Sequence, residues 1–372
     1  MRGDGGPSNR WPECDRKHLV RRPARGRPLA GCQSTMVGAS VSRLLLLLWA
    51  CTQPPAPPQP PGPLGHATAV VAADMDGDGR DDLVTVSAGQ ASWPGHNLAL
   101  EGKVSAFTRG DVGQDGKEDV LLATGAGKGF PAATTRLWRL GTDGPELLWE
   151  AARGRQRITD IRVEQGAIFI ALFSGGKTLS GAWVESGTLR RVTRTQMGLQ
   201  QIPLTGGQVA VGRLYGDAPR SEGDLRILSP DAEDRVLPTL RGVRALGAAD
   251  LDGDGELDLL AADGWHFKYG THGRARVVVF MGPGFKDRRV LAEFPDEYTI
   301  NRIEVLARAE GGPRILLTGT QQVHLLQQDG MGWQSRTIAP VTELDRAVLW
   351  SDQGHQYAIV SGSPAKAIAL DG

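Results

Sequence analysis

The sequence predicts an all-β fold made of repeated four-stranded units. Short β-rich runs alternate with turns rich in Gly, Asp and Pro from about residue 66 onward, and no helical period is sustained. The chain contains 50 glycines and 23 prolines, which indicates many turns. A nine-residue acidic segment also occurs in two near-identical copies. These three observations favour a fold assembled from small antiparallel sheets.

Eight segments are expected to be strands. Each is a short run of β-branched and other apolar residues bounded by turn residues, and several are apolar almost throughout, as expected for strands buried on both faces. They span residues 69–73, 83–87, 120–124, 167–173, 208–214, 274–281, 314–318 and 357–361.

The acidic segment is the most distinctive feature of the sequence. Residues 74–82 read Asp-Met-Asp-Gly-Asp-Gly-Arg-Asp-Asp, and residues 250–258 read Asp-Leu-Asp-Gly-Asp-Gly-Glu-Leu-Asp. So many carboxylates within nine residues repel one another unless a cation neutralises them. A surface turn without a metal is the alternative, but the two copies agree at every carboxylate position that a metal would need.

Calcium is the cation that this pattern favours, because it takes about 6–8 oxygen ligands in flexible geometry. The expected ligands in the second loop are the side chains at positions 1, 3, 5 and 9 and the carbonyl oxygen at position 7: Asp250, Asp252, Asp254, Asp258 and Glu256. Gly255 is expected to make the sharp turn of the loop. An EF-hand does not fit, because position 12 is Thr85 or Ala261 instead of Glu and the flanks are β-like.

A third copy is incomplete, and the spacing of the copies suggests a repeat length. Residues 111–119 keep aspartates at positions 1, 5 and 9, but Gly113 replaces the carboxylate at position 3. From Asp74 to Asp250 is 176 residues, or four steps of 44, and residues 68–372 leave room for about seven such units. Residues 158–175, 209–227, 303–319 and 344–362 keep only a strand-turn-strand rhythm. Seven four-stranded antiparallel blades around one axis make a seven-bladed β-propeller, in which radial closure protects the strand edges.

The acidic loops resemble the FG-GAP/VCBS repeats found in the β-propeller of integrin α-subunits. The resemblance is carried by Asp-x-Asp-Gly-Asp-Gly-x-x-Asp-Leu at residues 74–83 and 250–259, and in part at residues 111–120. It implies calcium bound in the loop between the first and second strands of a blade. In the first loop the implied ligands are Asp74, Asp76, Asp78, the Arg80 carbonyl and Asp82, and weaker binding or none is implied at Asp111, Asp115, the Lys117 carbonyl and Asp119.

The N-terminal part predicts export. A basic residue, the apolar run 44–49 and the small residue Ala50 precede Cys51, as in a secretory signal. The ending Leu48-Trp-Ala-Cys51 resembles the lipobox of bacterial lipoproteins, although Trp49 stands where a small residue is usual. The resemblance implies a lipidated Cys51. Because Thr52 follows instead of Asp, it also favours the outer membrane of a two-membrane bacterium.

Four segments follow from this interpretation. Residues 1–35 are basic and lack apolar periodicity, so we expect translation to begin at Met36; a disordered, nucleic-acid-binding extension is the alternative. Residues 36–50 are the signal peptide, residues 51–66 a proline-rich polyproline spacer, and residues 67–372 the propeller.

The part after the signal is mildly acidic and lacks cysteines suited to catalysis or disulfides. Residues 1–50 contain nine of the 42 basic and three of the 42 acidic residues, which leaves 33 and 39, or a net charge of −6. This balance suits cation binding and argues against nucleic acid. Cys14, Cys32 and Cys51 all lie at or before the cleavage junction, so neither a disulfide nor a nucleophilic thiol is expected in the propeller.

One further segment is a candidate ligand face. Trp265, His266 and Tyr269 lie just after the second acidic loop, beside Lys268 and His272. They either line a glycan or peptide pocket or pack between blades and cap a long loop. Trp93 and His96 follow the first loop at a comparable offset.

The sequence thus favours a non-enzymatic binding module for a protein or carbohydrate partner. The seven histidines show no metal-ligand spacing, and neither a nucleophile elbow nor a P-loop occurs. The alternatives are a propeller enzyme acting on glycans, for instance a lyase, and a passive module of a larger complex. The enzyme would need Tyr, His, Arg or Lys side chains that converge on one face or in the central channel.

Overall fold

The structure is a computed structural model of the whole chain. It describes residue 65 and residues 67–125, 133–151, 156–174, 177–185, 188–190, 195–196, 198–204, 207–214, 223–229, 232–239, 242–264, 274–296, 298–309, 312–329, 332–341, 347–352, 355–362 and 364–370. These residues form strands and turns and contain no α-helix. Among them, accordingly, no helix has the length and apolar character needed to cross a membrane.

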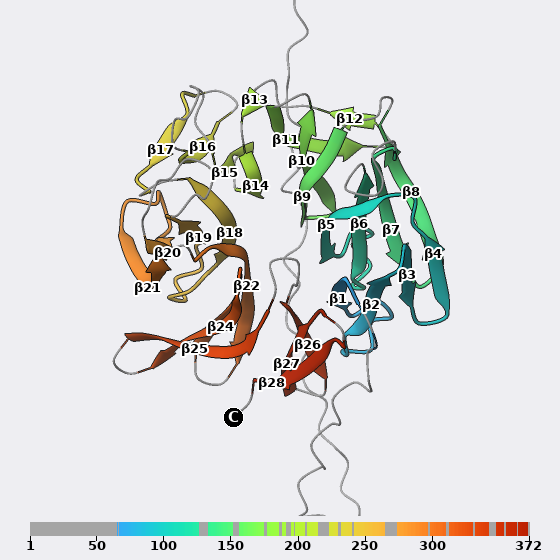
Figure 1. Cartoon of the computed structure of the whole chain (residues 1–372). Coiled ribbons are helices and arrows are strands. Elements are labelled where there is room, and N and C mark those ends of the chain that lie inside the picture. The colour runs from blue at the N-terminus through green and yellow to red at the C-terminus, as the bar shows by residue number, and fades with distance from the viewer. Residues whose placement is uncertain are drawn as a thin grey trace, which may run out of the picture. The chain divides into compact units, whose positions relative to one another are not determined.

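The described strands form seven antiparallel sheets, numbered here in chain order (Figure 1). The first sheet has the order β1 (Ala69–Ala73), β2 (Asp82–Ser87), β3 (Gln90–Trp93), β4 (His96–Ala99). The second has the order β5 (Lys103–Gly110), β6 (Asp119–Gly125), β7 (Arg136–Gly141), β8 (Gly144–Glu150). The third has the order β9 (Gln156–Glu164), β10 (Ala167–Ser174), β11 (Lys177–Glu185), β12 (Thr188–Arg190), with β13 (Thr195–Gln196) also paired to β11.

The remaining four sheets repeat this order. The fourth consists of β14 (Gly198–Pro203), β15 (Val209–Arg213), β16 (Leu225–Leu228) and β17 (Arg235–Leu237). The fifth consists of β18 (Val243–Ala249), β19 (Asp258–Asp263), β20 (Arg274–Phe280) and β21 (Arg288–Asp296). The sixth consists of β22 (Ile300–Ala309), β23 (Gly312–Gly319), β24 (Gln322–Asp329) and β25 (Gly332–Pro340). Three described strands form the seventh: β26 (Ala347–Asp352), β27 (His355–Val360) and β28 (Lys366–Ala369).

The sheets form a β-propeller. The first strand of each sheet contacts the first strand of the next, and β26 of the last sheet contacts β1 of the first. In Figure 1 the sheets accordingly follow one another around a common centre, from blue β1 to red β28. The predicted all-β propeller of mostly four-stranded antiparallel sheets is therefore confirmed.

The hydrophobic core lies between neighbouring sheets. One cluster joins Ala106, Leu121 and Ile161 of the second and third sheets, and another joins Leu260, Ile303 and Leu317 of the fifth and sixth. The largest cluster combines residues of the seventh, first and second sheets, including Trp350 and Ile359 beside Val71. Burial of apolar side chains between sheets thus continues across the junction of the first and last sheets.

All eight predicted strands are present. They correspond to β1, β2, β6, β10, β15, β20, β23 and β27, with ends that differ by two residues or fewer. One of the weaker repeats is displaced: residues 209–227 cover β15 and β16, the second and third strands of their sheet, instead of the first and second. Continuous apolar character marks middle strands as well as first strands, so it does not fix a strand's place in the sheet.

The three acidic loops occupy equivalent places. They connect β1 to β2, β5 to β6 and β18 to β19, in each case the first and second strands of a sheet. The paired residues at the base of the loops also correspond: Ala73 with Asp82, Gly110 with Asp119, and Ala249 with Asp258. Because β1 and β18 begin the first and fifth sheets, the step of four repeats between the two intact loops is confirmed.

Hydrogen bonds join the beginning and the end of the described chain. Ala67 and Gly362 exchange two backbone hydrogen bonds, each of 3.0 Å. Beside them, the Ser351 amide donates to the Asp81 carboxylate (2.6 Å), and the Trp350 indole donates to the Asp81 carbonyl (2.7 Å). The last sheet is thereby fastened to the first acidic loop and to the residue that precedes β1.

Candidate functional site

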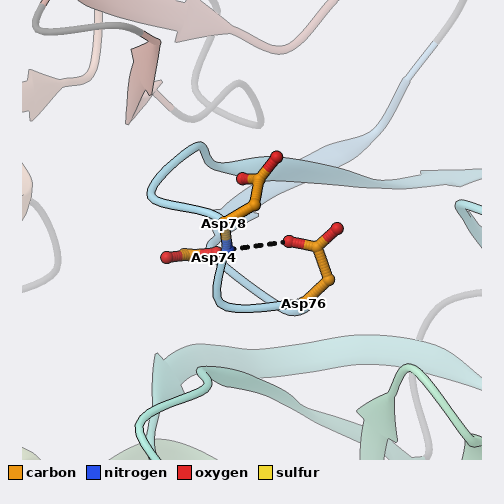
Figure 2. Close-up of side chains that lie close together, drawn as sticks. All are labelled: Asp74, Asp76 and Asp78. Carbon is orange, nitrogen blue, oxygen red and sulfur yellow. Dashed lines mark hydrogen bonds between the residues drawn. The ribbon is translucent and has the colours of Figure 1, made fainter.

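The first acidic loop brings three carboxylates together. Asp74, Asp76 and Asp78 each offer an oxygen, and these oxygens lie within 4.8 Å of one another. Figure 2 shows the loop curling so that the three side chains gather around one side of it. Asp74 is half-buried, whereas Asp76 and Asp78 are exposed. A cluster of hard oxygen donors on an accessible loop has the chemistry that a divalent cation such as calcium requires.

The backbone of the loop holds these carboxylates in place. The amides of Gly77 and Gly79 donate to the two oxygens of Asp74 (2.9 and 3.0 Å). Farther along, Asp78 donates its amide to Asp76 (3.0 Å), and Arg80 donates its amide to Asp78 (2.8 Å). Backbone amides of the loop itself therefore position all three carboxylates.

The second acidic loop repeats this framework bond for bond. Asp250 accepts from the amides of Gly253 (2.6 Å) and Gly255 (3.1 Å), Asp252 from that of Asp254 (3.2 Å), and Asp254 from that of Glu256 (2.8 Å). Oxygens of Asp250, Asp252 and Asp254 again lie within 4.8 Å of one another. Two loops far apart in the sequence thus present the same donor set.

The glycines of the loops are required by the backbone. At position 4, Gly77 and Gly253 have φ of 80° and 82°; at position 6, Gly79 and Gly255 have φ of 85° and 89°. L-residues with a side chain rarely adopt these left-handed values. The sharp turn predicted at Gly255 is confirmed, and an equivalent turn occurs two residues earlier.

The aspartate at position 9 is engaged differently from the other three. Asp258 is buried and accepts from the amides of Leu251 and Gly282, both at 2.8 Å. Burial, and then the charges of Asp252 and Asp254, raise the pKa of Asp258, while the two amides lower it. Burial and the charges of Asp76, Asp78 and Asp74 likewise raise the pKa of Asp82. These residues close the base of each loop, next to the carboxylate triplet.

The incomplete third loop keeps the frame without the triplet. Asp111 accepts from the amides of Asp115 (3.1 Å) and Gly116 (2.9 Å), and Asp115 accepts from that of Lys117 (3.0 Å). Asp119 is paired with the guanidinium of Arg139, whose Nε lies 2.8 Å away. Of the three loops, all within the described residues, this one has no group of three carboxylates, and an arginine balances part of its charge.

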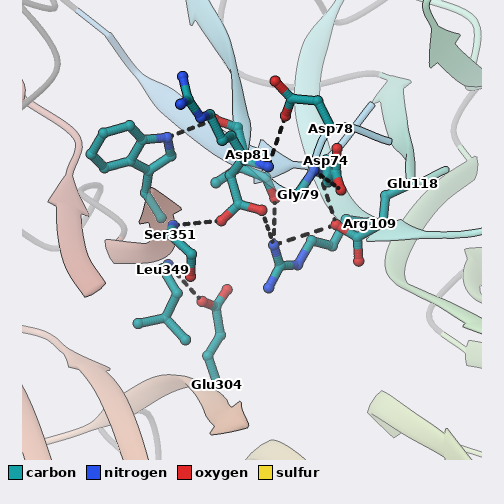
Figure 3. Close-up of polar contacts among 12 residues, drawn as sticks. Asp74, Asp78, Gly79, Asp81, Arg109, Glu118, Glu304, Leu349 and Ser351 are labelled. Carbon is teal, nitrogen blue, oxygen red and sulfur yellow. Dashed lines mark hydrogen bonds and ion pairs between the residues drawn. The ribbon is translucent and has the colours of Figure 1, made fainter. Parts of the chain in front are cut away.

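The first loop is also connected to its neighbours, as Figure 3 shows. Asp74 exchanges two bonds with Glu118 of the third loop: the Glu118 amide donates to the Asp74 carbonyl (2.8 Å), and the Asp74 amide donates to the Glu118 carboxylate (3.2 Å). Arg109 forms ion pairs with Asp81 (3.1 Å) and Glu118 (3.4 Å). The first acidic loop therefore touches the second sheet on one side and the seventh on the other.

Several predicted residues cannot be placed. Trp265, His266 and Tyr269 lie outside the described residues, as do Cys51, the signal segment and the proline-rich spacer. The related pair Trp93 and His96 is described: the rings stack 5.5 Å apart, the Trp93 indole donates to the Gly141 carbonyl (3.0 Å), and His96 Nε2 lies 2.8 Å from the Thr142 carbonyl oxygen. At this position the pair fastens the first sheet to the second.

A central cavity of about 210 Å³ holds charged residues that the sequence did not single out. All seven first strands contribute to its wall, which contains Arg109, Arg162, Arg302, Asp160 and Glu304. A local signal does exist: Asp160-Ile-Arg162 and Arg302-Ile-Glu304 each place opposite charges two residues apart around a buried isoleucine. Alternate residues of a strand share a face, so both charges reach the cavity. The same pattern also occurs elsewhere, at Asp224 and Arg226, and therefore does not identify the cavity by itself.

Comparison with known proteins supports the fold and gives no family. No family model matches the chain, and no curated protein matches it. Among solved structures, a crystal structure of BBS1N in complex with ARL6DN, soaked with lead, is similar with a TM-score of 0.54 at 11% sequence identity. The match covers 83% of this chain and 93% of that chain. A mercury-soaked crystal of the same complex gives a TM-score of 0.48 at 10% identity, covering 83% and 92% of the two chains. At such identities the likeness shows the propeller fold alone.

Proposed function

We propose that this chain is a calcium-stabilised, seven-bladed β-propeller of the FG-GAP/VCBS type that serves as a non-enzymatic binding module on a bacterial cell envelope. The observation that carries the proposal is the bond-for-bond equivalence of the loops at residues 74–82 and 250–258. Each gathers three carboxylates at the junction of the first two strands of a sheet. We count the seven sheets as seven blades because their first strands contact one another in sequence order and the last contacts the first.

Calcium would act here as a structural ion. Asp74, Asp76 and Asp78, with the Arg80 carbonyl and Asp82, would hold it in the first loop, and Asp250, Asp252, Asp254, the Glu256 carbonyl and Asp258 in the second. Bound calcium cancels the repulsion within each triplet and joins two strands at their turn. A ligand at 100 times its Kd stabilises the folded state by about 2.7 kcal/mol per site.

Metal-stripped protein tests this part of the proposal. Titration with calcium in a calorimeter should give two sites, and the thermal midpoint should rise as calcium is added. Asp250→Ala should abolish one site and much of the thermal response. Asp143→Ala, which removes an exposed carboxylate from the turn between β7 and β8, is the matched control and should keep both sites. If the thermal midpoint of the metal-stripped wild-type protein does not change when calcium is added, calcium is not a structural ion.

The anchor and the partner are the remaining parts of the proposal. A lipid on Cys51 and a proline-rich spacer at residues 51–66 would hold the propeller near the outer membrane, where it would present a face to a protein or carbohydrate. Cys51→Ala should stop incorporation of labelled palmitate and release the protein into the soluble fraction. Trp265→Ala and His266→Ala should weaken binding on glycan and peptide arrays; unchanged binding would remove this segment as the ligand face.

A further inference from the structure

The central cavity contains three arginines whose hydrogen-bonding capacity is only partly used. Arg162 donates from Nε to Asp160 (3.2 Å) and from Nη2 to the Leu246 carbonyl (3.3 Å). Arg302 donates from Nε to Glu304 (2.6 Å), with its Nη2 on the same carboxylate oxygen. Within the part of the chain that the structure describes, no contact engages Nη1 of Arg162 or Nη1 of Arg302.

Arg109 adds a third guanidinium to the same wall. Its Nη1 contacts the Ala72 carbonyl (3.1 Å), Asp81 and Glu118. Among the described residues, none of the contacts of Arg109 involves its Nη2. Since a guanidinium carries five N–H donors, each of the three arginines keeps donors for another acceptor.

The acidic residues of the wall are committed to the protein backbone. Asp160 accepts from the Gln201 amide (2.8 Å), and Glu304 accepts from the Leu349 amide (3.1 Å). Each carboxylate thus accepts a hydrogen bond from a backbone amide on the unpaired edge of the next sheet's first strand. It also accepts from its arginine. The wall holds three arginines and two carboxylates, but Arg109 is also paired with Asp81 and Glu118, so the attraction for an anion rests mainly on the unused donors of Arg162 and Arg302. Burial, which outweighs the nearby arginines, raises the pKa of Asp160.

The arginines are also held in position. The guanidinium of Arg302, on β22, lies 4.7 Å from the centroid of the Phe107 ring on β5, a cation–π contact between strands that are not neighbours in the ring. Arg162 is fixed at two points, by Asp160 and by Leu246. Preorganised guanidiniums bind carboxylates and phosphates well, because their planar forks match the geometry of these groups and little ordering remains to be done.

We propose that the central cavity binds a small molecule through a carboxylate or phosphate group held by Arg162 and Arg302, with Arg109 adding a third donor. The volume of about 210 Å³ is below the roughly 300–1,000 Å³ of pockets for drug-sized ligands, so the ligand is the size of an inorganic anion or a single sugar acid. This site is additional to the proposed calcium-dependent scaffold. Arg109 connects the two, through Asp81 and Glu118.

Titration calorimetry of the full chain in calcium-free buffer tests the site. The probes are inorganic phosphate, galacturonate and galactose. Phosphate or galacturonate should bind and lose affinity as salt rises, because screening weakens attraction between charges. Whichever of the two binds more tightly identifies the source of the oxyanion. Galactose, which lacks the charge, should not bind. Equal binding of galactose, or no binding of either anion up to about 10 mM, would overturn the proposal.

Two substitutions of opposite sign separate anion binding from a structural role of these residues. Arg162→Gln removes a donor fork and a positive charge and should weaken binding at least about tenfold. Glu304→Gln keeps an acceptor for the Leu349 amide but removes a negative charge, and should tighten binding by about threefold or more. Arg274→Gln, an exposed arginine 3.6 Å from Glu293, is the matched control and should bind as wild type.

The fold is checked separately for each variant through the calcium-dependent rise of its thermal midpoint. If the arginines serve only to bind backbone carbonyls, Arg162→Gln and Glu304→Gln will not change the anion affinity in opposite directions. That result would refute the site. If Arg162→Gln fails to fold, the Glu304→Gln variant and the salt dependence decide the question on their own. If no anion binds in the cavity but the thermal midpoint still rises with calcium, the anion-site proposal fails and the scaffold proposal stands.

Discussion

At the scale of single residues, position 3 decides which acidic loops gather a triplet. Gly113 occupies this position in the third loop, and its φ is outside the left-handed region. A β-carbon added there would lie 3.6 Å from the carboxyl carbon of Asp115 and 3.8 Å from Arg139 Nη2, which are ordinary contact distances. The site therefore has room for the missing side chain.

Gly113→Asp is expected to create a third cation site. The new carboxylate would join Asp111 and Asp115, which accept from the amides of Gly116 and Lys117 as their counterparts do in the intact loops. It would also offer the Asp115 amide, which now donates to Asp111, the position-3 acceptor that the intact loops use. Calorimetry should then show three calcium ions per chain instead of two. Gly113→Asn, of equal size without the charge, is the control. An unchanged stoichiometry would mean that Arg139, paired with Asp119, already neutralises the loop.

His324 gives the stability a pH dependence whose sign is fixed by burial. Its ring packs 4.9 Å from that of Phe294, its Nε2 lies 3.0 Å from Tyr298 Oη, and burial lowers its pKa. The unfolded chain takes up a proton near pH 6.5, whereas the folded chain does so only at lower pH. The contribution of neutral His324 is therefore complete above about pH 6.5 and declines as the pH falls from there towards the folded pKa.

Urea denaturation of wild type and His324→Gln from about pH 7.5 to about pH 5 measures this effect. The free energy of unfolding of the wild type should fall more steeply, by up to about 1.4 kcal/mol per pH unit. The raised pKa of Asp160 acts in the opposite direction, because the folded state then holds that proton more tightly, but it is common to both proteins and cancels in the comparison. Parallel curves would show that the pKa of His324 is the same in the folded and unfolded states.

Much of the residue-scale picture could be predicted from sequence. The carboxylates of an acidic loop, the glycines that allow its turn and the amides that hold the carboxylates all lie within nine consecutive residues. A linear sequence pattern is therefore enough to identify such a loop. The cavity arginines carry no such pattern. Arg109 and Arg302 are separated by most of the propeller and meet only because the ring closes. Their convergence is a property of the tertiary structure.

At the scale of elements, the first strand of each sheet presents an unpaired edge to the centre. Several of its amides are satisfied by a side chain from the preceding sheet. Asp160 serves Gln201, Gln200 serves Leu246 at 2.6 Å, and Glu304 serves Leu349. The polar residues of the first strands therefore stabilise the fold and can also serve as ligand groups. The apolar pattern of these strands does not reveal either role.

Asp81 plays the corresponding part where the last sheet meets the first. Asp81→Ala should lower the free energy of unfolding by about 1–3 kcal/mol, because it leaves the Ser351 amide and Arg109 without their partner. Asp81→Asn, which keeps an acceptor for Ser351, should lose less. Chemical denaturation in the presence of a chelator measures this without any contribution from metal. A change no larger than that of Asp143→Ala would show that the Asp81 side chain does not stabilise the junction.

The outer strands are absent from the eight predicted strands, as are most first and third strands. β4 alternates between half-buried and exposed residues, β8 contains only exposed and half-buried residues, and β17 is mostly exposed. Strands at the rim bury little apolar surface, so they lack the hydrophobic run that identified β6 or β20. Six of the eight predicted strands are the second strands of their sheets, which were predictable because burial between sheets favours a continuous apolar composition.

At the scale of the whole molecule, closure of the ring should matter more than the order of the sheets along the chain. A chain that ends at residue 341 lacks the seventh sheet and exposes the apolar faces of its two neighbours, including Val71 and Leu325. It should lose cooperative unfolding and bind a hydrophobic dye. A circular permutant that joins residue 370 to residue 67 through a short flexible linker and opens at the turn of Asp143 keeps every sheet. It should unfold cooperatively near the wild-type midpoint, and a permutant as disordered as the truncated chain would contradict this view.

The reciprocal pair between Ala67 and Gly362 has a mechanical consequence. A force that pulls residues 65 and 370 apart acts on the hydrogen bond from the Ala365 amide to the Gly65 carbonyl (2.9 Å) and on the two Ala67–Gly362 bonds, as well as on β28, which directly precedes residue 370. Behind them it meets the bonds of Asp81 to Ser351 and Trp350. Stretching from the two ends should therefore part the first and seventh sheets as an early, separate event, and only afterwards extend the remaining sheets one after another.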